Sequence, residues 1–199
     1  MAAKVILNKV EIQNRYNRVL TEDSYKDLAY RNAKTRFDFA QEDLLEDFDK
    51  HEITKELLEG PTAENSILPK GNLTSFLGIP NSAVVVAKIR HKLKSLIKMD
   101  KTPEVKISSK KVMYKFDVNV PPIKDLSVPS PWSSKGIVEL IEDGVTNIIA
   151  FIYFSLFKKS SRSGHGLQNK NIKTRGSGRV LGIPYLSEIL EKFKAAFPK

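Results

Sequence analysis

Hydrophobic residues recur every three or four positions over residues 23–49, a spacing that places them on one side of an α-helix. The pattern predicts a long helix from about Asp23 to Asp49, which Thr21 or Asp23 can cap. A short helix around Ile53–Leu58 follows, and Gly60-Pro61 ends it. The expected inner stripe of the long helix consists of Tyr25, Leu28, Ala29, Ala33, Phe37, Ala40, Leu44 and Phe48.

The segments on either side of this helical region carry weaker patterns. Residues 1–20 show a short alternation of apolar and polar positions, which favours a strand. Residues 60–82 are rich in Gly, Pro, Asn and Ser, and we expect an ordered loop anchored by Leu73, Phe76 and Leu77. Ser82 then caps a predicted helix. Its inner face is Val85, Val86, Ile89, Leu93, Leu96 and Ile97, and its outer face is Lys88, Arg90, Lys92, Lys94 and Lys98.

Apolar and polar residues alternate most regularly over residues 104–120. Val105 and Ile107 alternate with charged residues, and a second alternating run extends from Val112 to Val120. This period of two predicts an antiparallel hairpin that turns at residues 108–110. Pro121-Pro122 ends the second strand, because proline cannot donate a hydrogen bond to the ladder.

The last third of the chain mixes apolar runs with Pro, Ser and Gly. Residues 121–134 form a Pro/Ser-rich crossing, after which Ser133 or Ser134 caps an apolar run that extends to residue 152. Its length favours a helix, with two buried strands as the alternative. Residues 158–180 form a polar, basic loop, and Pro184 opens a final helix. The fold class is therefore α+β: one domain over residues 1–199, with an N-terminal helical segment (about 1–59), a small antiparallel sheet packed against two or three helices, and extended loops at 60–82 and 158–180.

Composition narrows the classes of function. The 199 residues include no cysteine, which excludes disulfides and thiolate chemistry. The N-terminus lacks the apolar region of a signal peptide, and the most apolar run, residues 145–157, is too short to span a bilayer. We therefore expect a soluble intracellular protein, without a membrane partner. The net charge of +10 favours nucleic acid or acidic protein partners, or simply maintains solubility.

Charge is segregated along the chain. Residues 42–59 hold eight carboxylates against two lysines, and residues 158–179 hold seven basic residues and no acidic one. A basic Gly/Ser loop can follow a nucleic-acid backbone or dock on an acidic neighbouring subunit. Copies arranged head to tail would pair the two segments and close into a ring.

Catalytic signatures are weak. The three histidines, His51, His91 and His165, are widely separated in sequence and lack metal-ligand spacing. The chain has neither a phosphate-binding loop nor a nucleophile elbow. We therefore expect no catalytic, metal or cofactor site and a protein that is not an enzyme. A hydrolase that uses His51 or His165 is the remaining catalytic alternative.

Four segments together carry a family resemblance. These are residues 48–79 (FDKHEITKELLEGPTAENSILPKGNLTSFLGI), 131–145 (PWSSKGIVELIEDGV), 161–168 (SRSGHGLQ) and 185–193 (YLSEILEKF). With the order of long helix, hairpin, second helix and Ser/Arg/Gly loop, they resemble the neck and tail-completion family of long-tailed bacteriophages.

The resemblance implies a structural virion protein of the phage neck. Such a protein forms an oligomeric ring that joins the head connector to the tail tube or its terminator, and double-stranded DNA passes through the ring. The expected interface residues are Phe76, Trp132, Arg162, Lys170, Arg175, Glu46 and Asp47, since aromatic and arginine side chains anchor interfaces and opposite charges pair across them. The alternative is a nucleic-acid-binding protein that acts through the 88–98 helix and the 158–179 loop.

Overall fold

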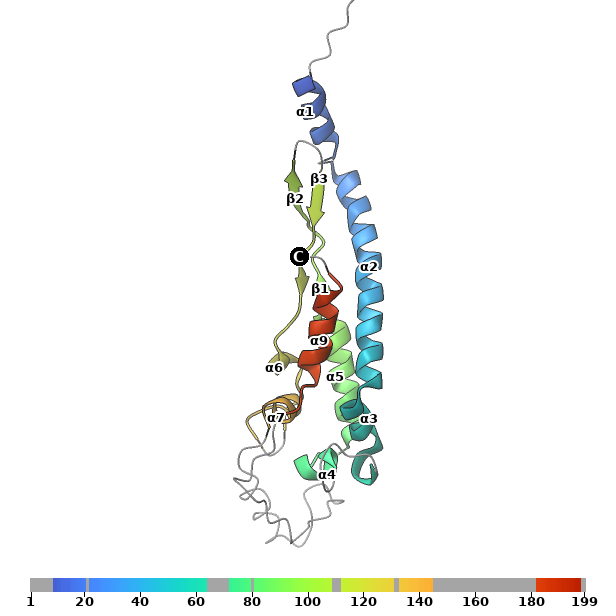
Figure 1. Cartoon of the computed structure of the whole chain (residues 1–199), viewed down its shortest axis with the longest axis vertical. Helices are drawn as coiled ribbons and strands as arrows, with labels where there is room; N and C mark the ends of the chain where they lie inside the picture. Colours follow the sequence, from blue (N-terminus) through green and yellow to red (C-terminus); the bar gives the residue numbers. More distant parts are fainter. Residues whose placement is uncertain are drawn as a thin grey trace, which may run out of the picture. The chain divides into compact units, whose positions relative to one another are not determined.

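The computed structural model describes residues 9–20, 22–63, 72–79, 81–108, 112–130, 133–144 and 182–197. Its helices are α1 (Lys9–Leu20), α2 (Asp23–Lys50), α3 (Glu52–Glu59), α4 (Leu73–Leu77), α5 (Ser82–Leu96), α6 (Ile123–Leu126), α7 (Ile137–Asp143) and α9 (Leu186–Ala195), with a 3-10 turn, η1 (Gly60–Thr62) (Figure 1). Two antiparallel two-stranded sheets accompany them. The α+β prediction is confirmed.

Both predicted N-terminal helices form, and an unpredicted one precedes them. Residues 23–59 contain no Gly or Pro, so α2 runs for 28 residues. His51 interrupts the helical backbone and caps α3, because its Nδ1 accepts a hydrogen bond from Ile53 N at 3.2 Å. The strand predicted within residues 1–20 is wrong over residues 9–20, where α1 forms. Apolar residues at Ile12, Tyr16 and Val19, spaced by four and three, are the helical signal for this segment.

The hairpin is shorter than its pattern predicted. β2 (Glu104–Ile107) pairs with β3 (Val112–Lys115) in the register Glu104↔Lys115 and Ile107↔Val112. The second predicted strand breaks at residues 116–117. Beyond the break, β4 (Val118–Asn119) pairs with β1 (Lys98–Met99), a strand that was not predicted because it is only two residues long.

Long-range contacts divide the chain into two compact units. Unit 1 comprises residues 1–39 and 97–120, and unit 2 comprises residues 40–96 and 121–199. The apolar core of unit 2 is extensive. In this unit α3 packs against α4 and α5, and α6 packs against α5 and α7. Its fully buried side chains include Phe48, Ile53, Leu57, Ile89, Leu93, Leu126, Tyr185, Leu186 and Ile189.

Side chains distant in sequence cap the short helices of unit 2. Glu56 Oε1 accepts a hydrogen bond from Leu73 N at 2.6 Å at the start of α4, and Glu142 Oε1 accepts one from Ser187 N at 2.7 Å in α9. Ser127 Oγ accepts a hydrogen bond from Val138 N at 3.0 Å in α7, replacing the predicted caps Ser133 and Ser134. These bonds satisfy amide groups that a short helix leaves without partners.

Two further sequence predictions are corrected in unit 2. The 60–82 loop contains η1 and α4; Leu73 and Leu77 are buried as expected, and Phe76 lies in α4. Asn81, not Ser82, caps α5, because its Oδ1 accepts a hydrogen bond from Val84 N at 3.4 Å.

Two helix boundaries in the last third of the chain also differ from the prediction. α7 ends at Asp143 and Gly144 (φ 74°) caps it, whereas the prediction extended to residue 152; residues 145–152 lie outside the described residues. α9 begins at Leu186, two residues after Pro184.

Candidate interaction surfaces

Apolar side chains are distributed unevenly between the two units. Among the described residues of unit 1, only Phe37 and Ile97 are buried hydrophobic residues. All the other buried hydrophobic residues of the described chain lie in unit 2. The large apolar side chains exposed in unit 1 are Tyr16, Val19, Tyr25, Leu28, Phe39, Ile107 and Met113. Among the described residues, unit 1 therefore exposes more large apolar side chains than unit 2, where Leu58, Val84 and Leu96 are the exposed ones.

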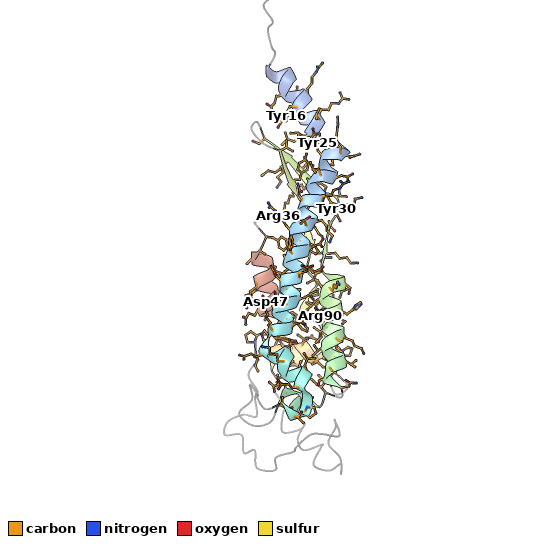
Figure 2. All side chains as sticks on the ribbon, turned by 90° about the vertical axis from the view of Figure 1, so that its right-hand side faces the viewer. Tyr16, Tyr25, Tyr30, Arg36, Asp47 and Arg90 are labelled. Atoms are coloured by element: carbon orange, nitrogen blue, oxygen red, sulfur yellow. The ribbon has the colours of Figure 1, made fainter. Side chains whose placement is uncertain are left out.

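One part of this surface is a stripe along α2. Leu28 follows Tyr25 by three residues, and Phe39 follows Leu28 by eleven, about three turns of an α-helix. The side chains of Leu28 and Phe39 are 55% and 64% exposed. Arg36, labelled with Tyr25 in Figure 2, is also exposed on this part of α2. We call Tyr25, Leu28 and Phe39 the outer stripe.

The outer stripe corrects the prediction of a single buried stripe. Steps of four residues exceed a 3.6-residue turn, so each advances the side chain by about 40° around the helix. Leu28 and Phe37 are nine residues apart, and at about 100° per residue this separation places them on opposite sides of α2. Phe37, Ala40, Leu44 and Phe48 are buried, whereas Tyr25 and Leu28 are exposed.

The β2–β3 hairpin has one face towards the helices of unit 1. Tyr114 Oη donates a hydrogen bond to Leu20 O, and the Phe116 ring lies 5.9 Å from that of Tyr30. Val105, opposite Tyr114 in the register, is half-buried on the same face. The other face carries Glu104, Lys106, Met113 and Lys115, all exposed.

The predicted acidic surface lies on α2 and α3, with one exception. Glu46 and Asp47 are exposed on α2 as the interface prediction requires, although Glu46 also accepts a hydrogen bond from Lys50. That bond raises the pKa of Lys50. Glu56 differs from the other carboxylates because it is only 2% exposed and bonds to Leu73 N. The exposed members are Glu42, Asp43, Glu46, Asp47, Asp49, Glu52 and Glu59.

The remaining predicted interface residues cannot be assigned to a surface. Trp132, Arg162, Lys170 and Arg175 lie outside the described residues, and so does the 158–180 loop. Phe76 lies in α4, and its side chain is outside the described set.

The basic face predicted for residues 88–98 is partly engaged inside unit 2. Arg90 Nε donates hydrogen bonds to both carboxylate oxygens of Asp49 at 3.0 and 3.1 Å; Figure 2 labels Arg90 on α5. Lys92 Nζ donates to Asp125 O at 2.8 Å and to Ser127 O, which ties α5 to the end of α6. Lys98 belongs to β1 instead of the helix. Lys88 and Lys94 remain exposed on α5.

His51 has a structural position in unit 2. Its ring lies 5.0 Å from the Tyr185 ring, and the Tyr185 hydroxyl is 2.8 Å from Thr54 Oγ1 in a buried hydrogen bond. Burial raises the pKa of Tyr185. Burial also lowers the pKa of His51 and outweighs Glu188, Glu52 and Asp47, which act to raise it; Lys192 acts with burial to lower it. His91 is exposed on α5, and His165 lies outside the described residues.

The depressed pKa of His51 predicts a loss of stability in acid. The unfolded chain protonates His51 near its ordinary value of 6.5, whereas the folded protein resists protonation. Stability contributed by neutral His51 is therefore present above pH 6.5 and falls as the pH drops through that value. Asn is also a good N-cap, so His51→Asn should flatten the decline in urea-unfolding free energy between pH 7.5 and 5.5. His91→Asn is the exposed control; an unchanged slope in His51→Asn would contradict the prediction.

The described residues show neither a metal-binding cluster nor a membrane-spanning helix. Within these residues, no group of three or more His, Cys, Asp or Glu side chains is arranged to hold a metal ion. No described helix combines the length and the apolarity needed to cross a membrane.

Comparison with protein-family models, curated proteins and solved structures gives no match.

Proposed function

We propose that this chain is a structural virion protein of a phage neck, a subunit that assembles into a ring between the head connector and the tail and is not an enzyme. The observation that carries the proposal is the exposed apolar surface of unit 1, on the outer stripe, α1 and the hairpin. Burial of such surface between subunits is favourable by roughly 25 cal/mol per Å². Unit 1 has a small apolar core of its own. Contacts between subunits would therefore bury apolar side chains that unit 1 alone leaves exposed.

Charge supports assembly from copies of one chain. Glu46 and Asp47 are exposed in unit 2, and the segment 158–179 carries only basic charge. Pairing of one with the other in the next copy is a heterologous contact, and such contacts close into rings when the rotation permits. The resemblance of residues 48–79, 131–145, 161–168 and 185–193 to neck and tail-completion proteins gives the ring its proposed place.

The decisive experiment is analysis of virions of the virus that encodes the chain. Mass spectrometry of purified particles should detect the protein, and electron microscopy of particles labelled through a C-terminal tag should place it at the head–tail junction. Particles assembled without the protein should contain full heads that lack attached tails. Absence of the protein from purified virions would overturn the proposal.

DNA binding through exposed Lys88 and Lys94 is the second candidate. The engagement of Arg90 and Lys92 in contacts within the chain leaves a smaller basic surface on α5 than the sequence predicted. A gel shift at micromolar protein that weakens steeply with salt would favour this candidate, because phosphate binding releases counterions. Lys88→Glu/Lys94→Glu should then abolish the shift.

A further inference from the structure

The β2–β3 hairpin is a two-stranded sheet among the described residues, and β3 carries its contacts to α1 and α2 through Tyr114 and the following Phe116. In Figure 1, β3 lies on the α2 side of the hairpin within unit 1. An isolated two-stranded hairpin has only marginal stability in water. The open edge of a strand presents unpaired N–H and C=O groups that can pair with another strand. The outer edge of β2 is therefore suited to strand addition.

We propose that β2 of one chain pairs antiparallel with β2 of a second copy, with Val105 opposite Val105 across a two-fold axis. The inference shares one premise with the proposed function, namely that copies of this chain associate, and rests on it in no other way. The pair closes on itself, so it differs from the head-to-tail contact of a ring. It would cover the β2 edge of the free subunit and prevent open-ended sheet growth.

The alternation of a ladder restricts the possible registers. In an antiparallel pair, successive residues turn their backbone groups towards opposite edges of the strand. A residue that faces β3 cannot also bond to a strand on the outer edge. In a pair of β2 strands, each residue must therefore lie opposite a residue whose backbone groups face the same edge. The numbers of two opposed residues then differ by zero or by an even number, so the two-fold axis passes through a residue. Within β2 this condition allows centres at Glu104, Val105, Lys106 or Ile107.

Overlap and charge together select one of these four registers. A centre at Ile107 opposes only that residue within β2, whereas a centre at Val105 or Lys106 opposes three residues of each strand. A centre at Glu104 or Lys106 places like charges directly opposite each other, which is destabilising. A centre at Val105 places Glu104 of each copy opposite Lys106 of the other, giving two cross-strand ion pairs. Within one chain the same two side chains lie 3.6 Å apart and are about half exposed, so they are accessible to a second copy.

The apolar face supports the same register. Val105 is half-buried on the face that carries Tyr114. Pairing at Val105 would place the two valines side by side on this face and extend the apolar layer across the two-fold axis. Pro103, which precedes β2, cannot donate to the ladder and limits the length of the new pairing.

A charge-swap series tests the register in the full chain. Glu104→Lys or Lys106→Glu alone should weaken dimerisation about tenfold, because each replaces two attractive pairs per dimer by two repulsive ones. Glu104→Lys/Lys106→Glu should restore it at unchanged net charge. Both Glu104→Lys chains lose the pairing with Lys115 in their own hairpin, but the double swap also restores the pair between positions 104 and 106 within each chain. The unfolding free energy of each dilute monomer is therefore measured too, which separates the effect within the hairpin from the contact between copies. Sedimentation equilibrium gives the dissociation constants, and circular dichroism verifies folding.

Cross-linking gives an independent readout, because the chain has no cysteine of its own. Val105→Cys should form a disulfide-linked dimer under mild oxidation, since directly opposed β-carbons lie within about 5.5 Å. Lys101→Cys, outside β2, is the control and should form no disulfide-linked dimer. A mixture in which Val105→Cys links to Tyr114→Cys would show β2–β3 pairing and overturn the inference.

Failure of the inference is separable from failure of the proposed function. A wild-type chain that stays monomeric at about 100 µM, or a double swap that stays as weak as Glu104→Lys, overturns the β2 pairing. Neither result bears on the presence of the protein in virions, which tests the neck assignment.

Discussion

Phe48→Ala is expected to lower the free energy of unfolding by about 3–5 kcal/mol, whereas Phe39→Ala on the same helix should change it by less than about 0.5 kcal/mol. Phe48 is fully buried, and its ring stacks on Tyr185 with 6.0 Å between centroids. Phe39 is 64% exposed. Both substitutions replace phenylalanine by alanine within α2, so the change in helix propensity is the same for both.

Urea titration followed by circular dichroism at low protein concentration measures both values. The low concentration matters because Phe39 belongs to the outer stripe and would be covered in an assembly. At high concentration Phe39→Ala should weaken self-association while Phe48→Ala mainly destabilises the subunit. Equal losses of unfolding free energy in the two dilute variants would contradict the burial pattern of α2.

Glu56→Ala should lower the free energy of unfolding by about 2–4 kcal/mol. Glu56 is 2% exposed, and its carboxylate accepts the Leu73 amide at 2.6 Å. Its removal leaves that buried amide without this acceptor and leaves a cavity between α3 and α4.

Glu56→Gln is the matched control, because the amide oxygen can still accept from Leu73 N. It should cost about 1 kcal/mol, less than half the loss in Glu56→Ala. Glu59→Ala, an exposed glutamate on the same helix, should have almost no effect. Thermal and urea unfolding of the three variants provide the comparison. A Glu56→Ala protein as stable as Glu59→Ala would refute the role of Glu56 as a cap.

Local patterns determined the elements with strong periodicity. The spacing in residues 23–59 predicted α2 and α3, and the alternation at 104–115 predicted the β2–β3 hairpin. Apolar spacing also predicted most of the buried face of α5: Val85, Val86, Ile89 and Leu93 are buried, whereas Leu96 at the end of the helix is exposed. These predictions succeed because the hydrogen bonds of a helix or hairpin join residues close together in sequence. The spacing of apolar residues on one face is likewise visible within a short segment.

Short elements and individual partners depended on the tertiary structure. β1 is two residues long and exists through pairing with β4, about twenty positions later. Glu56 belongs to the acidic segment 42–59, and only the approach of α4 gives it a buried amide partner. A local sequence pattern cannot predict which residues, far apart in the chain, will lie next to each other in the folded protein.

The same distinction applies to the candidate interfaces. The sequence by itself determined the segregation of charge, the absence of cysteine and the helical periodicity of α2. Only the tertiary structure decided which apolar positions of α2 are covered, because periodicity gives the angle of a side chain around the helix but not the presence of a neighbour there. It buried Phe37 and Phe48 and left Tyr25, Leu28 and Phe39 exposed.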